Sequence, residues 1–168
     1  AFMERITECR PSLVACDLHP GYHTSRIARA MEGRQVVAVQ HHHAHIVSCM
    51  AENRIQGKLI GLAFDGTGYG TDGAIWGGEF LIADETGFDR AGHLAYVPLP
   101  GGAAAIREPW RMAASCLHTV FGQNMRELDL PLMREIDAKK LAFVQDMMVK
   151  GVNCPRTSSM GRLFDAVA

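Results

Sequence analysis

Apolar runs and helical spacing alternate through the first part of the chain. Residues 13–17 and 35–40 are short apolar runs, and each predicts a buried strand. Residues 25–32 and 42–53 have the composition and spacing of helices, with Gly33 placed to end the first. The four segments together predict a strand–helix–strand–helix order, which is typical of a partly parallel sheet covered by helices.

The hydrophobic pattern changes in the middle of the chain. Residues 58–64 and 74–83 are strand-like, and the glycine-rich stretch DGTGYGTDG separates them. This arrangement predicts a β-hairpin with a long, flexible turn that exposes its backbone. Residues 93–97 predict one more strand before Pro98 and Pro100.

Helices are predicted for the last part of the chain. A broad apolar stripe marks a helix over residues 108–122, with Pro109 suited to its first turn, and a second helix covers 137–150. A third begins near Ser158 and keeps its apolar pattern up to Ala168. Because the chain also begins without methionine, we expect residues 1–168 to be a fragment of a longer protein. The fold class is α/β, a mixed sheet with flanking helices in a partial domain.

Composition narrows the class of protein. The chain is 48% hydrophobic and 21% charged, as in ordinary globular proteins, and its net charge of −1 gives no attraction to nucleic acid or to anionic membranes. No signal peptide and no membrane-spanning apolar run is found, and the five cysteines are scattered without a CxxC pair. We therefore expect a cytoplasmic protein with reduced cysteines that binds neither nucleic acid nor membrane.

The run HHHAH is the strongest local signal for chemistry. His41 and His45 have the i, i+4 spacing of a helix, at the start of the predicted helix, so their imidazoles project from one face about 6 Å apart and can share a metal ion, whereas His42 and His43 point elsewhere. A solvated histidine cluster is the alternative, since this spacing alone is not specific. The position directly after a buried strand favours the metal site.

Asp65 is the candidate for a third ligand. It ends the strand 58–64 and enters the glycine-rich turn, where a carboxylate could complete the shell of the two imidazoles. A turn-forming aspartate is the alternative, and for Asp72 in the same loop it is the favoured one. Two imidazoles and one carboxylate suit Fe(II) and Zn(II) about equally.

The glycine-rich loop could cradle an anion with its backbone N–H groups. It does not have the Walker pattern, and it joins two strands, which excludes a Rossmann turn. A phosphate-binding hairpin between antiparallel strands is the arrangement of actin, the sugar kinases and the chaperone ATPases. A purely structural hairpin is compatible with the same composition.

Several long motifs in the correct order resemble one enzyme family. The stretches VACDLHPGYHTSRIA, VAVQHHHAHIVSCMAE, GLAFDGTGYGTDGAIWGGEFL, REPWRMAASCL and TSSMGRLFDAVA cover nearly the whole chain. Together they are similar to the hydrogenase-maturation carbamoyltransferases of the HypF family. The similarity lies in the first part of that family's C-terminal domain, which is actin-like and related to the threonylcarbamoyl-tRNA transferases.

The resemblance implies an enzyme and its partners. The complete protein would make carbamoyl-adenylate from carbamoyl phosphate and ATP, and this domain would pass the carbamoyl group to the C-terminal cysteine of HypE. The product becomes a cyanide ligand of NiFe hydrogenase. His41, His45 and Asp65 would hold a divalent Fe or Zn ion, while the nucleotide or carbamoyl group would contact Gly66, Thr67, Gly68, Tyr69, Gly70, Asp72 and Ser158.

The resemblance also implies what this chain lacks. The second lobe, with a further aspartate ligand and most of the adenine pocket, would lie beyond Ala168, so the isolated fragment would be inactive and would depend on the rest of the HypF chain. No residue here is a compelling general base, and no catalytic residue is assigned. An O-carbamoyl or tRNA threonylcarbamoyl transferase, or a non-catalytic lobe that binds nucleotide or metal, remains as an alternative.

Overall fold

A computed structural model describes residues 2–168, and its first part is a small α/β unit. Strands β1 (Leu13–Asp17) and β2 (Gln35–Val39) pair in parallel, with Asp17 opposite Val39. Helix α2 (His23–Arg29) connects them, α1 (Phe2–Thr7) precedes them, and α3 (His41–Asn53) follows directly. The predicted strand–helix–strand–helix order is confirmed, although α2 begins earlier and ends earlier than predicted because residues 30–33 form a turn.

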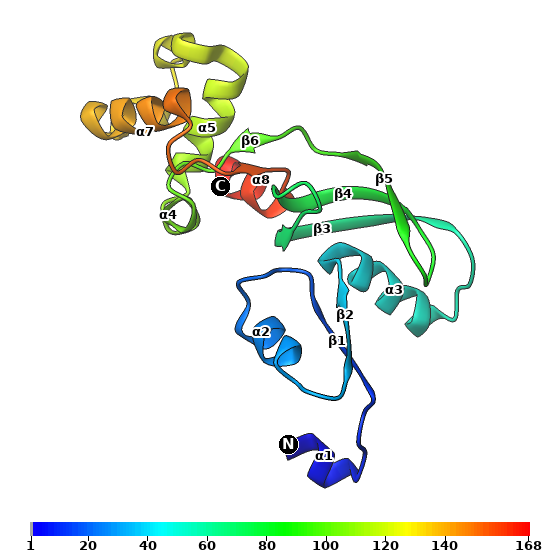
Figure 1. The fold of residues 1–168 in the computed structure, drawn as a ribbon. Helices are drawn as coiled ribbons and strands as arrows, with labels where there is room; N and C mark the ends of the chain where they lie inside the picture. Colours follow the sequence, from blue (N-terminus) through cyan, green and yellow to red (C-terminus); the bar gives the residue numbers. More distant parts are fainter. Residues whose placement is uncertain (1) are drawn as a thin grey trace.

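The second part is built around a mixed five-stranded sheet. Antiparallel β3 (Leu59–Tyr69) and β4 (Ile75–Ala83) form its main hairpin, and β5 (Phe88–His93) also pairs with β4. Two short strands, β6 (Val97–Pro98) and β7 (Arg156–Thr157), complete the order β3-β4-β7-β6. Figure 1 shows α3 lying between this sheet and the β1–β2 pair.

The hairpin is present, but the prediction that its turn is long and flexible is wrong. The glycine-rich stretch stays paired as far as Tyr69, which lies opposite Ile75, so the turn is confined to residues 70–74. The register shifts between Phe64 and Gly68, and residues 65–67 therefore leave the ladder as a bulge opposite a single residue of β4. The strand predicted at 93–97 is also displaced, because β5 ends at His93 and only Val97–Pro98 pairs again.

Helices gather at the other end of the sheet. The predicted helices correspond to α5 (Trp110–Phe121), α7 (Ala138–Lys150) and α8 (Met160–Val167). Three short elements have no clear periodicity and were not predicted: α4 (Ala103–Arg107), the 3₁₀ helix η1 (Gly122–Glu127) and α6 (Pro131–Glu135). Helix α8 returns to the end of the β3–β4 hairpin and lies beside it (Figure 1), which brings the last helix to the glycine-rich bulge.

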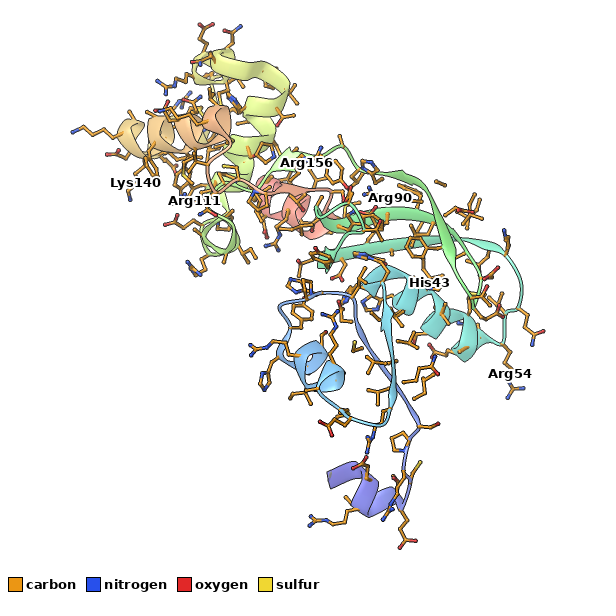
Figure 2. All side chains as sticks on the ribbon, viewed as in Figure 1. His43, Arg54, Arg90, Arg111, Lys140 and Arg156 are labelled. Atoms are coloured by element: carbon orange, nitrogen blue, oxygen red, sulfur yellow. The ribbon has the colours of Figure 1, made fainter. Side chains whose placement is uncertain are left out.

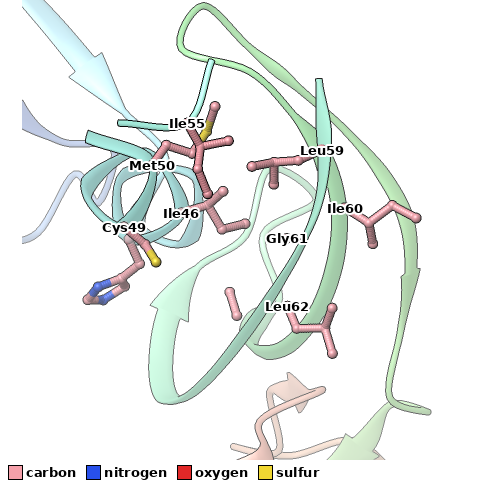
Figure 3. Close-up of a pocket in the computed structure, with 10 residues that line it drawn as sticks. Ile46, Cys49, Met50, Ile55, Leu59, Ile60, Gly61 and Leu62 are labelled. Atoms are coloured by element: carbon pink, nitrogen blue, oxygen red, sulfur yellow. The ribbon is translucent and has the colours of Figure 1, made fainter. Parts of the chain in front are cut away.

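Packing of α3 on the hairpin fixes where its histidines lie. Ile46 and Met50 on α3 join Trp76 and Leu81 on β4 in one buried cluster. A Cβ on Gly61 would come within 2.4 Å of Ile46 Cδ1, so β3 approaches α3 closely only because this residue is glycine. A pocket of about 280 Å³ remains between α3 and β3 (Figure 3). His45 contributes to its lining, and most of the other lining side chains are apolar.

Two further sequence expectations can be compared with the structure. All five cysteines are free, as their scattered spacing predicts. None of the helices in the described part of the chain is long and apolar enough to cross a membrane.

Candidate metal centre and glycine-rich bulge

The structure brings His41, His45 and Asp65 together. Asp65 Oδ2 lies 3.0 Å from His41 Nε2 and 3.7 Å from His45 Nε2, and the two Nε2 atoms are 3.1 Å apart. One potential ligand atom from each residue falls within 4.8 Å of the others. The three predicted ligand residues therefore lie together, and two imidazoles with one carboxylate fit a divalent Fe or Zn ion, while the binding of an ion remains a prediction.

Local structure places each member of this cluster. Strand β2 ends at Val39, and Gln40 caps α3 by accepting a 2.9 Å hydrogen bond from the His43 backbone N–H. His41 is therefore the first residue of α3, at the carboxyl end of a strand, and His45 lies one turn later. Asp65 opens the bulge of β3, which turns its carboxylate toward the start of α3.

Asp17 is a site residue that the sequence analysis did not assign. Its Oδ2 lies 2.9 Å from His41 Nδ1, while its Oδ1 accepts a hydrogen bond from the His19 backbone N–H. A carboxylate on Nδ1 keeps the proton there and leaves Nε2 free to bind an ion. The sequence did contain a signal for this contact. Asp17 ends the first apolar run, and in the structure it lies opposite Val39, which ends β2 two positions before His41.

The other two histidines of the run have different surroundings. His43 Nε2 lies 2.8 Å from the Asp84 carbonyl oxygen, away from the cluster as predicted. His42 is fully buried, and its Nε2 approaches within 3.9 Å of Asp65 Oδ2, so this ring is closer to the site than its helical position suggested. Burial, assisted by the neighbouring His41, lowers the pKa of His42 to about 4.

Asp65 is held as a carboxylate. Burial alone would raise its pKa, but the hydrogen bond from the Gly66 backbone N–H and the contact with His41 outweigh this and hold the pKa below its ordinary value. The Gly66 nitrogen lies 2.6 Å from Asp65 Oδ1, so one oxygen is fixed by the bulge and the other faces the histidines.

Helix α8 holds the bulge from the other side. Ser159 Oγ lies 2.8 Å from the carbonyl oxygens of both Asp65 and Gly66. A Cβ on Gly161 would come within 2.8 Å of Gly66 Cα, and one on Gly77 within 2.4 Å of the Asp65 carbonyl oxygen. The bulge is therefore enclosed by α8 and β4, and glycine is required at these contacts.

Arg162 is a second residue that the sequence analysis missed. Its side chain is 13% exposed and its Nη2 lies 3.1 Å from Asp165 Oδ2, while Nε and Nη1 are buried without a hydrogen-bond partner among the described residues. Its Nη2 would lie 3.9 Å from a Cβ on Gly66. A guanidinium with unpartnered donors beside a glycine-rich bulge favours a bound anion.

Asp72 and Ser158 belong to a neighbouring network rather than to the ligand cluster. Asp72 accepts hydrogen bonds from the Trp76 indole and the Tyr96 hydroxyl, at 2.9 and 2.6 Å. Burial alone would raise the pKa of Asp72, but these donors, with the Ala74 backbone N–H and Arg90, lower it to about 2. The role predicted for Asp72 as a turn former agrees with its Ala74 contact, whereas a ligand contact remains a prediction.

The centre of this network is a buried ion pair. Glu79 is fully buried, and its carboxylate accepts hydrogen bonds from Ser158 Oγ at 2.5 Å and from Arg90 Nε at 2.7 Å. The Arg90 guanidinium lies 3.9 Å from the Trp76 ring centroid and 5.3 Å from that of Tyr96, and Arg156 lies 5.0 Å from the same Tyr96 ring. Figure 2 labels Arg90 and Arg156 along this edge of the sheet. The Ser158 hydroxyl donates to Glu79, and its contact with a ligand remains a prediction.

Two backbone N–H groups of the glycine-rich stretch have partners within the chain. Gly70 N–H donates to the Ala74 carbonyl, and Gly66 N–H donates to Asp65. Contact of residues 66–70 with a nucleotide or carbamoyl group remains a prediction. A cavity of about 260 Å³ lies beside the bulge, lined by His42, His45, Leu62, Ala63, Phe64 and Asp65.

Comparison with known proteins decides the family. Residues 61–168 match the family model described as the second subdomain of the Kae1-like domain of carbamoyltransferase, and residues 1–52 match the HypF Kae1-like domain. The chain belongs to the HypF carbamoyltransferase family. The border between the two matched regions, after residue 52 and before residue 61, falls at the end of α3, where the β1–β2 unit gives way to the larger sheet.

Curated HypF relatives are much longer than this chain. The chain is 47% identical to carbamoyltransferase HypF2 of Cupriavidus necator, a match that covers 100% of the chain and 21% of the relative. It is 43% identical to HypF of Rhodobacter capsulatus, with 95% and 22% covered. The chain therefore spans about a fifth of the length of these HypF proteins.

Solved HypF structures share the fold. A crystal structure of full-length HypF in its phosphate- and nucleotide-bound form matches with a TM-score of 0.89 and 39% identity, covering 98% of this chain and 25% of that one. The HypF of T. kodakarensis matches with a TM-score of 0.80 and 36% identity, covering 94% and 22%. The predicted α/β, actin-like fold is confirmed. That a second lobe lies outside the chain stays a prediction.

Proposed function

We propose that the protein containing this HypF-family chain transfers a carbamoyl group from carbamoyl-adenylate to the C-terminal cysteine of HypE, and that this chain supplies part of the transfer site. The observation that carries the proposal is the cluster of His41, His45 and Asp65 beside a glycine-rich bulge. Relatives that are 47% and 43% identical to this chain are named carbamoyltransferases, which supports the reaction class.

The donor atoms support a bound divalent cation. His41, His45 and Asp65 each offer one ligand atom, and Asp17 orients the first imidazole through Nδ1. A bound ion would supply positive charge to polarise the carbamoyl oxygen or to neutralise the phosphoryl group. The cluster of described residues offers three ligand atoms, so the remaining positions would be filled by substrate, solvent or another part of the protein.

The bulge and Arg162 support binding of the adenylate. The unpartnered Nε and Nη1 of Arg162 are charged donors, and the guanidinium lies beside Gly66. Arginine binds phosphoryl oxygens well because its planar group offers two parallel N–H bonds. One related HypF structure is described as nucleotide-bound, which agrees with this assignment.

The proposed transfer needs no redox chemistry. The cysteine thiolate of the acceptor attacks the carbamoyl carbon, a carbon–sulfur bond forms, and the bond from that carbon to the adenylate oxygen breaks. AMP leaves with the electron pair of the broken bond, and the thiol proton has already gone to solvent. The side chains of this site bind and orient the adenylate; none of them is assigned as a general base.

The test uses the full-length protein that contains this chain. Labelled carbamoyl phosphate, ATP and HypE are supplied, and the label on the HypE C-terminal peptide is measured for the wild type and for the double variant His41→Ala, His45→Ala. The double variant should lose transfer to HypE and the metal bound at this site, yet still form carbamoyl-adenylate if that step occurs elsewhere. Unchanged metal content and unchanged transfer would contradict the proposal.

A matched control and a second acceptor sharpen this test. His93 is exposed and lies outside the cluster, so His93→Ala should leave the transfer unchanged. Supplying tRNA in place of HypE tests the related threonylcarbamoyl reaction. Label on tRNA and none on HypE would assign the other acceptor class.

A further inference from the structure

His42 is the most deeply enclosed side chain of the histidine run, and it is sealed beneath the glycine-rich hairpin. It is 0% exposed, and its ring lies 6.3 Å from the Trp76 ring at an interplanar angle of 30°. A Cβ on Gly68 would come within 2.4 Å of His42 Cε1. The imidazole therefore has little freedom to change its rotamer, and its hydrogen bonds are set by fixed neighbours.

Gln40 determines which nitrogen of His42 carries the proton. Gln40 Oε1 accepts the His43 backbone N–H at 2.9 Å, so the amide NH₂ faces the other way. That nitrogen lies 3.1 Å from the Tyr69 carbonyl oxygen and 3.2 Å from His42 Nδ1. Because an amide nitrogen can only donate, Nδ1 must accept, and the proton of the neutral imidazole is on Nε2.

This Nε2–H is a buried donor without a hydrogen bond to any described residue. Asp65 Oδ2 lies 3.9 Å away, too far for a hydrogen bond but within about 1 Å of that range. Unpaired buried donors are rare in folded proteins because each forfeits its bond to water. In this arrangement the same carboxylate oxygen is shared with His41 Nε2 at 3.0 Å.

We propose that His42 is a positioning residue for Asp65: its Nε2–H donates a hydrogen bond to the Asp65 carboxylate when that carboxylate coordinates a divalent cation. This inference rests on the metal site in the proposed function. When the lone pairs of His41 and His45 are committed to an ion, Asp65 loses its contact with the His41 ring and needs another donor. His42 offers a buried donor 3.9 Å from Asp65 Oδ2, and its ring is held in place by the close approach of Gly68.

The experiment measures cobalt binding to the full-length protein that contains this chain, after removal of bound metal. Co(II) is titrated against a competing chelator, and its visible absorption is recorded as a signature of the ligand field. The double variant His41→Ala, His45→Ala defines the signal from any other metal sites. If that variant binds as much cobalt as the wild type, the metal site itself is wrong, and both proposals fall.

Two substitutions at His42 separate hydrogen bonding from packing. His42→Gln keeps an N–H near the position of Nε2, whereas His42→Met has a similar volume and no donor. Cobalt affinity of the methionine variant should fall about 10- to 100-fold with an altered spectrum, and the glutamine variant should retain most of the affinity. Wild-type affinity in His42→Met, with cobalt lost from the double variant, overturns the role of His42 alone.

His43 provides the matched control. It lies on the same helix, is 8% exposed, and contacts the Asp84 carbonyl instead of the cluster. His43→Met should lower the thermal midpoint without changing the affinity or spectrum of the cobalt site. An equal loss of cobalt in His43→Met and His42→Met would show that helix packing is responsible, and would overturn the proposal.

A substitution at Gln40 tests the same inference without changing His42. In Gln40→Met, the amide that donates to Nδ1 is removed without a change of charge, so the proton of the imidazole is no longer held on Nε2. Cobalt affinity should then fall. Unchanged cobalt binding in a folded Gln40→Met protein overturns the proposal even if His42→Met does not fold.

Discussion

The carboxylate of Asp17 and the imidazole of His41 are joined by a 2.9 Å contact between Oδ2 and Nδ1, although the two residues are 24 positions apart. The contact arises because β1 and β2 are parallel and end side by side, with His41 starting α3 just after β2. The contact with Asp17 fixes the orientation of the His41 ring at Nδ1, on the opposite side from the Nε2 atom that would bind the metal.

Asp17→Asn should weaken metal binding at the cluster about 10- to 100-fold, because the neutral amide makes His41 a poorer ligand and no longer fixes its tautomer. Cobalt titration of the full-length protein measures the effect. Asp146→Asn is the control, since Asp146 lies on α7 and pairs with Lys150 at the surface. Equal affinities of wild type and Asp17→Asn would show that this carboxylate has no part in the site.

Gly68→Ala should lower the free energy of unfolding by about 1–3 kcal/mol, because the added methyl overlaps the enclosed His42 ring. Gly87→Ala is the control, in the turn between β4 and β5, where a Cβ meets nothing within 4 Å. That variant should be neutral or slightly more stable. Urea denaturation of both variants checks the difference, and a Gly68→Ala protein as stable as Gly87→Ala would contradict the packing described here.

Arg162→Gln should reduce the affinity for AMP about 10- to 100-fold and leave that for adenosine nearly unchanged, since the guanidinium is expected to contact the phosphoryl group and not the base. Isothermal calorimetry with the two ligands measures the ratio. Arg134→Gln is the control, because Arg134 is exposed on α6. A parallel loss for AMP and adenosine would indicate a general disturbance of α8 instead.

Asp72→Asn should be less stable than the wild type near neutral pH, and the difference should narrow as the pH falls. The pKa of Asp72 is lowered from 3.8 to about 2 in the folded chain, so its ionised form stabilises the fold above about pH 4. Between these values the unfolded chain takes up the proton first, and the stabilisation is lost toward pH 2. Urea midpoints of both proteins at pH 7, 5 and 3 follow this change; a constant difference would contradict it.

Much of the local structure was determined by the sequence alone. The order of β1, α2, β2 and α3 followed from the alternation of apolar runs and helical spacing, and the pairing of His41 with His45 followed from the fixed turn of a helix. Asp65 was recognised because a carboxylate follows an apolar run and precedes glycines, although the strand continues beyond it to Tyr69. These features depend on residues close together in the chain, where backbone geometry leaves few choices.

Long-range packing decided the rest. The bulge at residues 65–67 exists because β4 and α8 fit against it through glycines, and no local pattern distinguishes that bulge from a flexible turn. The contact of Asp17 with His41 depends on the pairing of two strands. The burial of His42 depends on which face of α3 the hairpin covers, so its role could be inferred only once Gly68 and Trp76 were placed over its ring.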